Sequence, residues 1–275
     1  MPLKRTLALL AAAMLLTVAA CSDDDSGGGG AGESGESGES GGGGGTTTAE
    51  ARDLAGAERP EGPAGTITGP LTGGGGLLLA AAAPPDLDAI GWVEEEYAVE
   101  GTATSYASEG ELPADGTFEL TERDEADYRT RIVVRRPAEA ADFDGTVVVE
   151  WLNVSAGFDA APDFTYLQDE LVRRGHAWVG VSAQHIGIEG GAVAVSTPLS
   201  EAAGAGKGLA ELDPERYGEL HHPGDAYMYD IYTQVARALR GPGDVDPLGG
   251  LEPAVLLAVG ESQSGFTLTT YANGV

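Results

Sequence analysis

The chain has 275 residues and a formal net charge of −29, from 44 acidic and 15 basic residues. An excess of negative charge of this size argues against electrostatic binding of nucleic acid or anionic lipid. Cys21 is the only cysteine, so no disulfide can form within the chain.

The N-terminus has the pattern of an export signal. Lys4 and Arg5 precede an apolar stretch, residues 6–17, that is too short for a comfortable membrane span. The sequence Val18-Ala19-Ala20-Cys21 follows and resembles a lipobox, in which the cysteine is lipidated and becomes the new N-terminus. The alternatives are an ordinary secretory signal or an uncleaved anchor. We therefore expect a signal peptide over residues 1–20 and a lipid anchor at Cys21, with the protein on the cell membrane facing outside the cytoplasm. Lipidation would leave no free thiol for catalysis or metal binding.

Residues 21–65 have low complexity. They contain two glycine runs, Gly27–Gly30 and Gly41–Gly45, and a repeated Gly-Glu-Ser between them. Such a composition cannot bury a core, which indicates a flexible and self-repelling tether. We expect the folded domain to occupy residues 66–275.

The first part of this domain reads as a group of antiparallel strands. Strands are predicted at Trp92–Thr104, Thr117–Thr121 and Asp127–Arg136. The apolar run Leu77–Ala83 lies between Gly-rich and Pro-rich segments and is expected as a strand or loop packed on the domain.

The second part alternates strands and helices. Thr146–Leu152 and His176–Ser182 are predicted strands, and Asp163–Arg174 is a predicted helix between them. This βαβ order predicts a parallel sheet. The segment from His185 to about Leu220 lacks strong periodicity and is expected to pass over the strand ends, before a predicted helix at Asp225–Leu239.

The most informative stretch begins with Val255–Val259, an apolar run expected as a parallel strand covered on both faces. Ser262 follows on a predicted tight turn, and a helix is expected over Gln263–Tyr271. Gly260 and Ser264 lie two residues before and after Ser262, which fits the loose form, small-x-Ser-x-small, of a nucleophile elbow. The alternative is that Ser262 only caps the helix.

A serine nucleophile needs donors for the oxyanion that it creates. We expect one to be the backbone N–H of Gln263, the residue after the nucleophile, and the second to come from the loop after the Thr146–Leu152 strand, at Asn153 or Val154. An ordinary strand-to-helix loop would explain that second segment equally well. Glu150 either orients this loop or is a structural acid.

Other motifs in the chain do not support a metal or nucleotide site. The four histidines all precede Ser262, whereas α/β-hydrolases place the general base after the nucleophile. His221 and His222, with Asp225, lack the i, i+4 spacing of metal ligands on a helix. Lys207 is followed by glycine, which excludes a P-loop. No cofactor and no metal are expected.

Four separated segments carry a family resemblance. They are VVVEWLNVSAG (147–157), WVGVSAQHIGIEGG (178–191), HPGDAYMYDI (222–231) and VGESQSGF (259–266). Together they resemble the large bacterial alpha/beta hydrolase domain proteins, from about Ile67 to the last residue. The resemblance implies the α/β-hydrolase fold, with Ser262 as nucleophile, but it supplies no substrate. The family's domain is longer, so we expect this chain to be truncated at its C-terminus, with the catalytic acid and histidine beyond residue 275.

The fold class expected is therefore α/β: the N-terminal part of an α/β-hydrolase fold, with a mostly parallel sheet, flanking helices and preceding antiparallel strands. The expected function is an exported serine hydrolase that cleaves an ester or related acyl bond in a small molecule and is inactive as this fragment. The alternative is a non-catalytic surface lipoprotein that uses the same fold for binding.

Overall fold

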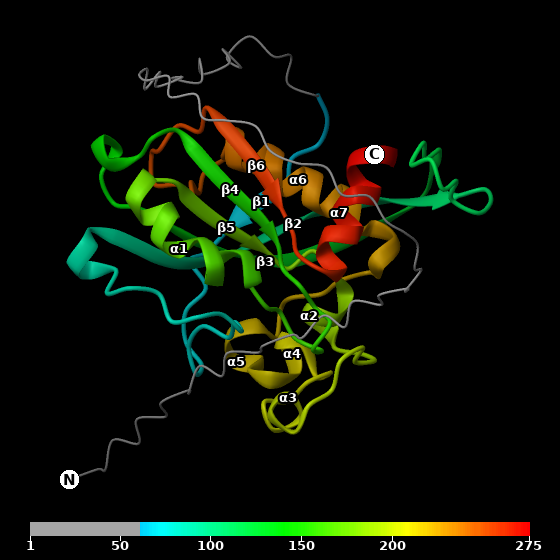
Figure 1. Ribbon diagram of the computed structural model, residues 1–275, viewed down its shortest axis with the longest axis horizontal. Helices are drawn as coiled ribbons and strands as arrows, with labels where there is room; N and C mark the ends of the chain where they lie inside the picture. Colours follow the sequence, from blue (N-terminus) through cyan, green and yellow to red (C-terminus); the bar gives the residue numbers. More distant parts are fainter. Residues whose placement is uncertain (1–60) are drawn as a thin grey trace, which may run out of the picture. The chain divides into compact units, whose positions relative to one another are not determined.

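The computed structural model describes residues 61–275, which form a six-stranded mixed sheet flanked by helices (Figure 1). The strands are β1 (Thr66–Thr68), β2 (Trp92–Ser108), β3 (Leu120–Pro137), β4 (Thr146–Trp151), β5 (Ala177–Val181) and β6 (Val255–Val259). Their order is β1-β2-β3-β5-β4-β6. The first three strands and the β3–β5 pair are antiparallel, whereas β4 is parallel to both β5 and β6. The predicted antiparallel group and the predicted parallel sheet are both confirmed.

The helices differ greatly in length. They are α1 (Pro162–Arg174), α2 (His185–Glu189), α3 (Pro198–Ala202), α4 (Gly208–Leu212), α5 (Pro214–Tyr217), α6 (Met228–Arg240) and α7 (Gln263–Gly274), with 3-10 turns η2 (Asp88–Ile90), η3 (Ala140–Asp142) and η4 (Asp225–Tyr227). α1, α6 and α7 agree with the predicted helices. The segment expected to lack periodicity contains the short helices α2 to α5, each too short to show a repeating apolar face.

The two longest helices, α1 and α6, cover opposite faces of the sheet (Figure 1). Phe164 and Leu171 of α1 pack with Trp178 of β5 on one face. Ile231 and Val235 of α6 pack on the other. α1 is followed by Gly175, whose φ of 72° lies in the left-handed region that residues just after a helix often adopt. The sheet is therefore buried between helical layers where β4 and β5 lie, which is the arrangement that α/β domains use.

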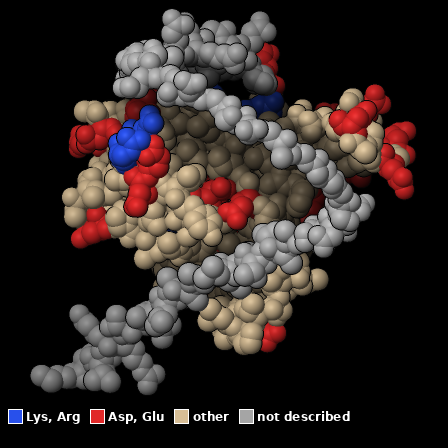
Figure 2. Space-filling model, in the orientation of Figure 1, with Lys and Arg blue, Asp and Glu red and all other residues tan. Residues whose placement is uncertain are grey.

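The β2–β3 hairpin is longer than the sequence predicts. Asp127–Arg136 and the last two residues of the predicted strand Thr117–Thr121 belong to the single strand β3, which pairs with β2 over nearly its whole length, whereas residues 117–119 lie outside it. The far end of the hairpin projects from the sheet (Figure 1) and carries acidic side chains (Figure 2). Polar pairs across the hairpin, such as Thr102 Oγ1 to Asp127 Oδ1 at 2.8 Å, add stability that a search for apolar runs does not detect. The run Leu77–Ala83 is mostly irregular, with a single bridge from Ala80.

A buried ionic cluster ties the short helices to the sheet. Arg131 of β3 is fully buried and lies 3.0 Å from Glu96 of β2 and 2.7 Å from Asp159. Arg216 of α5 donates from Nε to the same Glu96 at 2.6 Å. Buried charges are tolerated only when they are paired and hydrogen-bonded in this way. The cluster therefore fixes the position of α5 over β2 and β3.

β6 lies at the end of the described sheet, beside β4. Leu256 packs on the core between the sheet and α6, and Val259 packs on the opposite core. Leu257, however, is 46 % exposed. The expectation that this strand is covered on both faces is therefore wrong in part. In addition, within residues 61–275, β6 pairs with one strand only.

The predicted signal peptide, Cys21 and most of the predicted tether lie outside the described residues. Residues 61–65, assigned to the tether from composition, contact α6, where the Gly65 N–H donates to the Gln234 carbonyl at 3.2 Å. Of the helices in residues 61–275, none combines the length and apolarity that a membrane span requires.

Candidate active site

The centre of the site is the turn between β6 and α7. Ser262 has φ 56° and ψ −120°, and it is the only residue other than glycine with positive φ in the described part of the chain. Such a conformation costs a residue with a Cβ about 1–3 kcal/mol and persists only where the surroundings enforce it. The Ser262 side chain is exposed. Its Oγ makes no capping hydrogen bond to α7, so the alternative of a simple helix cap has no support here.

Small residues allow the strand and the helix to approach closely at this turn. A Cβ on Gly260 would lie 3.0 Å from the backbone of Ser264, and one on Gly265 would lie 3.0 Å from the Gly260 carbonyl oxygen. Ser264 is fully buried; its Oγ accepts from the Glu261 N–H at 3.1 Å and donates to the Glu261 carbonyl at 2.9 Å. The serine at this position, where the usual pattern has glycine, thus closes the turn around Ser262.

The loop after β4 is bonded to the turn through Asn153. Its side-chain Nδ2 donates to the Glu261 carbonyl at 2.9 Å, and its Oδ1 accepts from the Ser155 N–H at 2.9 Å. Its own backbone N–H donates to the Ala160 carbonyl at 2.8 Å and is therefore engaged. The N–H of Val154 has no acceptor among residues 61–275. Of the two candidate donors from this loop, Val154 is the one whose N–H remains available.

The loop after β5 holds the first residue of α7. Gln184 Oε1 accepts from Gln263 Nε2 at 2.9 Å and from Trp151 Nε1 at 3.2 Å. Gln184 Nε2 lies 3.4 Å from Asp225 Oδ2, and the same carboxylate accepts the His185 N–H at 2.7 Å. Side chains from the loops after β4 and β5 therefore converge on the residues that flank Ser262.

Glu150 serves the fold rather than the turn. It is fully buried and accepts hydrogen bonds from the N–H groups of Asp163 and Phe164, at the start of α1, and from Trp178 Nε1. Burial raises the pKa of Glu150 to about 8, against the opposing effect of these donors. A carboxylate at a helix N-terminus is a structural acid, and this is the interpretation that its contacts favour. Burial also raises the pKa of Asp163, and Glu261 raises it further.

None of the histidine rings in residues 61–275 hydrogen-bonds to Ser262. His222 is buried, with Nε2 2.9 Å from the Ala183 carbonyl, and burial lowers its pKa. His185 Nδ1 lies 3.0 Å from the His222 carbonyl, and His176 lies beside Asp144 at the N-terminal end of β5. The described residues include no cluster of three or more His, Cys, Asp or Glu side chains placed to hold a metal ion.

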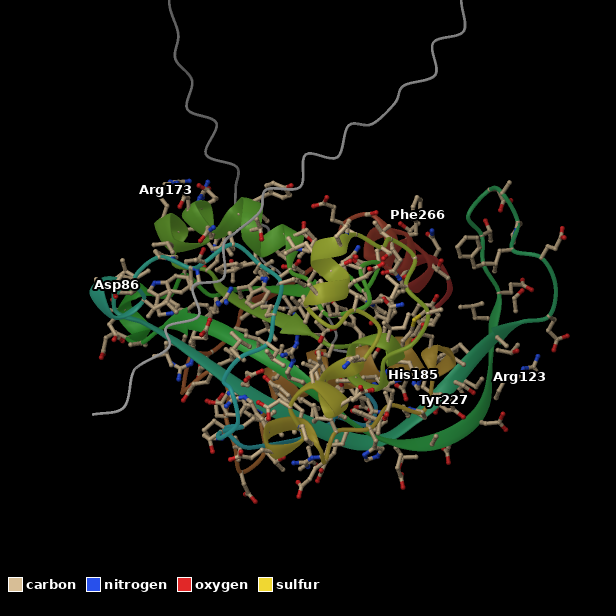
Figure 3. The ribbon with its side chains drawn as sticks, turned by 90° about the horizontal axis from the view of Figure 1, so that it is seen from below. Asp86, Arg123, Arg173, His185, Tyr227 and Phe266 are labelled. Atoms are coloured by element: carbon tan, nitrogen blue, oxygen red, sulfur yellow. The ribbon has the colours of Figure 1, made fainter. Side chains whose placement is uncertain are left out.

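The contacts of two residues of the site, Gln184 and Asp225, were not predicted from the sequence. Both lie in segments that carry the family resemblance, but neither was assigned a role at the turn. Gln184 follows a predicted parallel strand, where ligand-binding and catalytic side chains often lie. Phe266, one turn after Ser262, is 79 % exposed at the outer surface of α7 (Figure 3).

Comparison with known proteins agrees with the fold. A family model described as alpha/beta hydrolase domain matches residues 67–275. None of the curated proteins compared with the chain matches it. The family match covers both the mixed sheet and the strand–serine–helix turn, and the chain therefore belongs to the alpha/beta hydrolase domain family.

Proposed function

We propose that this protein is a serine hydrolase that cleaves an ester or related acyl bond of a small molecule, with Ser262 as the nucleophile. The observation that supports this most strongly is the backbone of Ser262, which is held at φ 56° with the side chain exposed at the N-terminus of α7. A strained serine between a strand and a helix is the geometry of a nucleophile elbow.

In the proposed reaction, Ser262 Oγ attacks the acyl carbon while a base removes its proton. The carbonyl oxygen becomes an oxyanion, for which the N–H groups of Gln263 and Val154 are the proposed donors. The positive end of the α7 dipole also favours negative charge at this point. The leaving group departs, and water then hydrolyses the acyl-enzyme.

The base and its acid are also part of the proposal. Positions 263–275 contain no His, Asp or Glu, and α/β-hydrolases place both groups after the nucleophile. We therefore place them in a longer protein that continues past residue 275. The same proposal attaches the enzyme to the membrane by a lipid at Cys21, facing outside the cytoplasm.

Labelling with a fluorophosphonate tests the proposal, since the probe reacts with activated serines. The protein made from the continued reading frame should be labelled, and Ser262→Ala should abolish the label. Ser196→Ala, at an exposed serine outside the turn, is the matched control and should leave labelling unchanged. The chain of residues 1–275 alone should not be labelled. Labelling that persists in Ser262→Ala would show that a different serine is activated and would contradict the proposal. A folded longer protein that is never labelled would also contradict it and would favour a binding role.

A further inference from the structure

We propose that Asn153 is a positioning residue that fixes the two oxyanion donors, the N–H groups of Gln263 and Val154, relative to each other. This inference rests on the proposed hydrolase function. It assigns to Asn153 a role that its side chain performs without touching the substrate.

The carboxamide of Asn153 bridges the two segments that supply the donors. Nδ2 donates to the carbonyl of Glu261, in the residue directly before Ser262, at 2.9 Å. Oδ1 accepts the N–H of Ser155, in the loop after β4, at 2.9 Å. The residue is only 8 % exposed. Because the amide is short and planar, these two bonds set the separation and orientation of the two segments.

The backbone around Val154 is held in the same way. Asn153 exchanges two backbone hydrogen bonds with Ala160, at 2.8 and 2.9 Å, and the Val154 carbonyl accepts the Gly157 N–H at 2.9 Å. The Oδ1 bond to the Ser155 N–H closes a turn around Val154, whose own N–H has no acceptor among residues 61–275. Val154 is 4 % exposed, so its backbone cannot shift freely. In a residue as buried as Val154, an N–H without a protein acceptor is rare, which fits a group that is reserved for a ligand.

Loss of the Asn153 bridge should therefore impair the transition state more than substrate binding. The oxyanion forms only during the reaction, and one well-placed donor contributes roughly 10²–10³ in kcat. A displacement of about 1 Å is sufficient to cost about 10²-fold.

The test is Asn153→Asp in the longer, active protein. The variant has nearly the same shape and keeps an acceptor for the Ser155 N–H, but it places a carboxylate oxygen against the Glu261 carbonyl. We expect kcat to fall by about 10²-fold and KM for a p-nitrophenyl ester to change by less than about 3-fold. Asn273→Asp makes the same chemical change at an exposed position at the end of α7 and should preserve both constants.

Asn153→Ser is the second variant, because it removes the bridge without adding charge. It should show the same loss of kcat, and it carries the test if the aspartate variant does not fold. The inference would be overturned if a folded Asn153 variant kept the wild-type kcat, or if its loss of kcat/KM came from a higher KM instead. In both cases Ser262→Ala would still abolish activity, so the proposed function would stand. Activity that survives Ser262→Ala would instead refute the proposed function itself.

Discussion

The strain at Ser262 can be measured by comparing two substitutions, Ser262→Ala and Ser262→Gly. Both remove the hydroxyl, and in the described structure Ser262 Oγ makes no capping hydrogen bond that would be lost. They differ only in the Cβ, which is the atom responsible for the cost of φ 56°. If the turn enforces this backbone conformation, glycine should be the more stable of the two.

The expected difference follows from two opposing contributions. A residue with a Cβ pays about 1–3 kcal/mol in this region of backbone space, and glycine avoids most of that cost. Glycine loses more conformational entropy on folding than alanine, at a cost of about 0.5–1 kcal/mol. The balance leaves Ser262→Gly more stable by about 1 kcal/mol. For domains of roughly 150–250 residues this corresponds to a rise in Tm of about 2–4 °C.

Differential scanning calorimetry of both variants under the same conditions measures this difference. The matched control is Thr269, an exposed position inside α7, where Thr269→Gly should be less stable than Thr269→Ala by about 1 kcal/mol. The order of the two variants should therefore reverse between the positions. If Ser262→Gly is the less stable by the same amount as at Thr269, the backbone at Ser262 is not strained and the argument for an elbow fails.

Two further predictions concern buried charges. In the folded state the pKa of Glu150 is about 8, above the ordinary value for a glutamate. The stability that Glu150 contributes is therefore complete at a pH below the ordinary glutamate pKa, and it is lost as the pH rises through about 8. Between about pH 5.5 and pH 8.5, the free energy of unfolding in urea should fall by about 1–3 kcal/mol more in wild type than in Glu150→Gln; parallel changes in the two proteins would refute this. Arg131→Met leaves the buried Asp159 without its cation, while Glu96 keeps Arg216, and should cost about 3–5 kcal/mol. Arg123→Met, on the projecting hairpin (Figure 3), breaks only an exposed pair with Glu109 and should cost less than about 1 kcal/mol. Equal losses at the two arginines would contradict the second prediction.

The sequence predicted those elements whose residues carry their own signal. β4 is an apolar run, α1 has apolar residues at helical spacing before a glycine, and the turn at Ser262 has small residues at fixed offsets. In each case neighbouring residues determine the structure. The α/β class and the parallel strands follow from the order of these elements.

The parts that were missed depend on partners far away in the chain. Arg131 and Arg135 belong to a stretch that resembles the polar face of a strand, yet both are buried because Glu96 and Glu94 of β2 pair with them. Likewise, the role of Gln184 depends on Gln263, which lies 79 positions away. Such pairs produce no repeating pattern within a short stretch of sequence.

The residues that hydrogen-bond around Ser262 are far apart in the sequence, and this separation affects the order in which the protein folds. Asn153 and Glu261 are 108 positions apart in the chain, so their bond closes a large loop, and we expect it to form only once β4 and β6 have paired. Until then nothing compels Ser262 to leave a relaxed backbone conformation. The nascent chain therefore carries an ordinary, unstrained serine, and the distorted geometry on which the proposed chemistry relies arises only when the sheet is assembled.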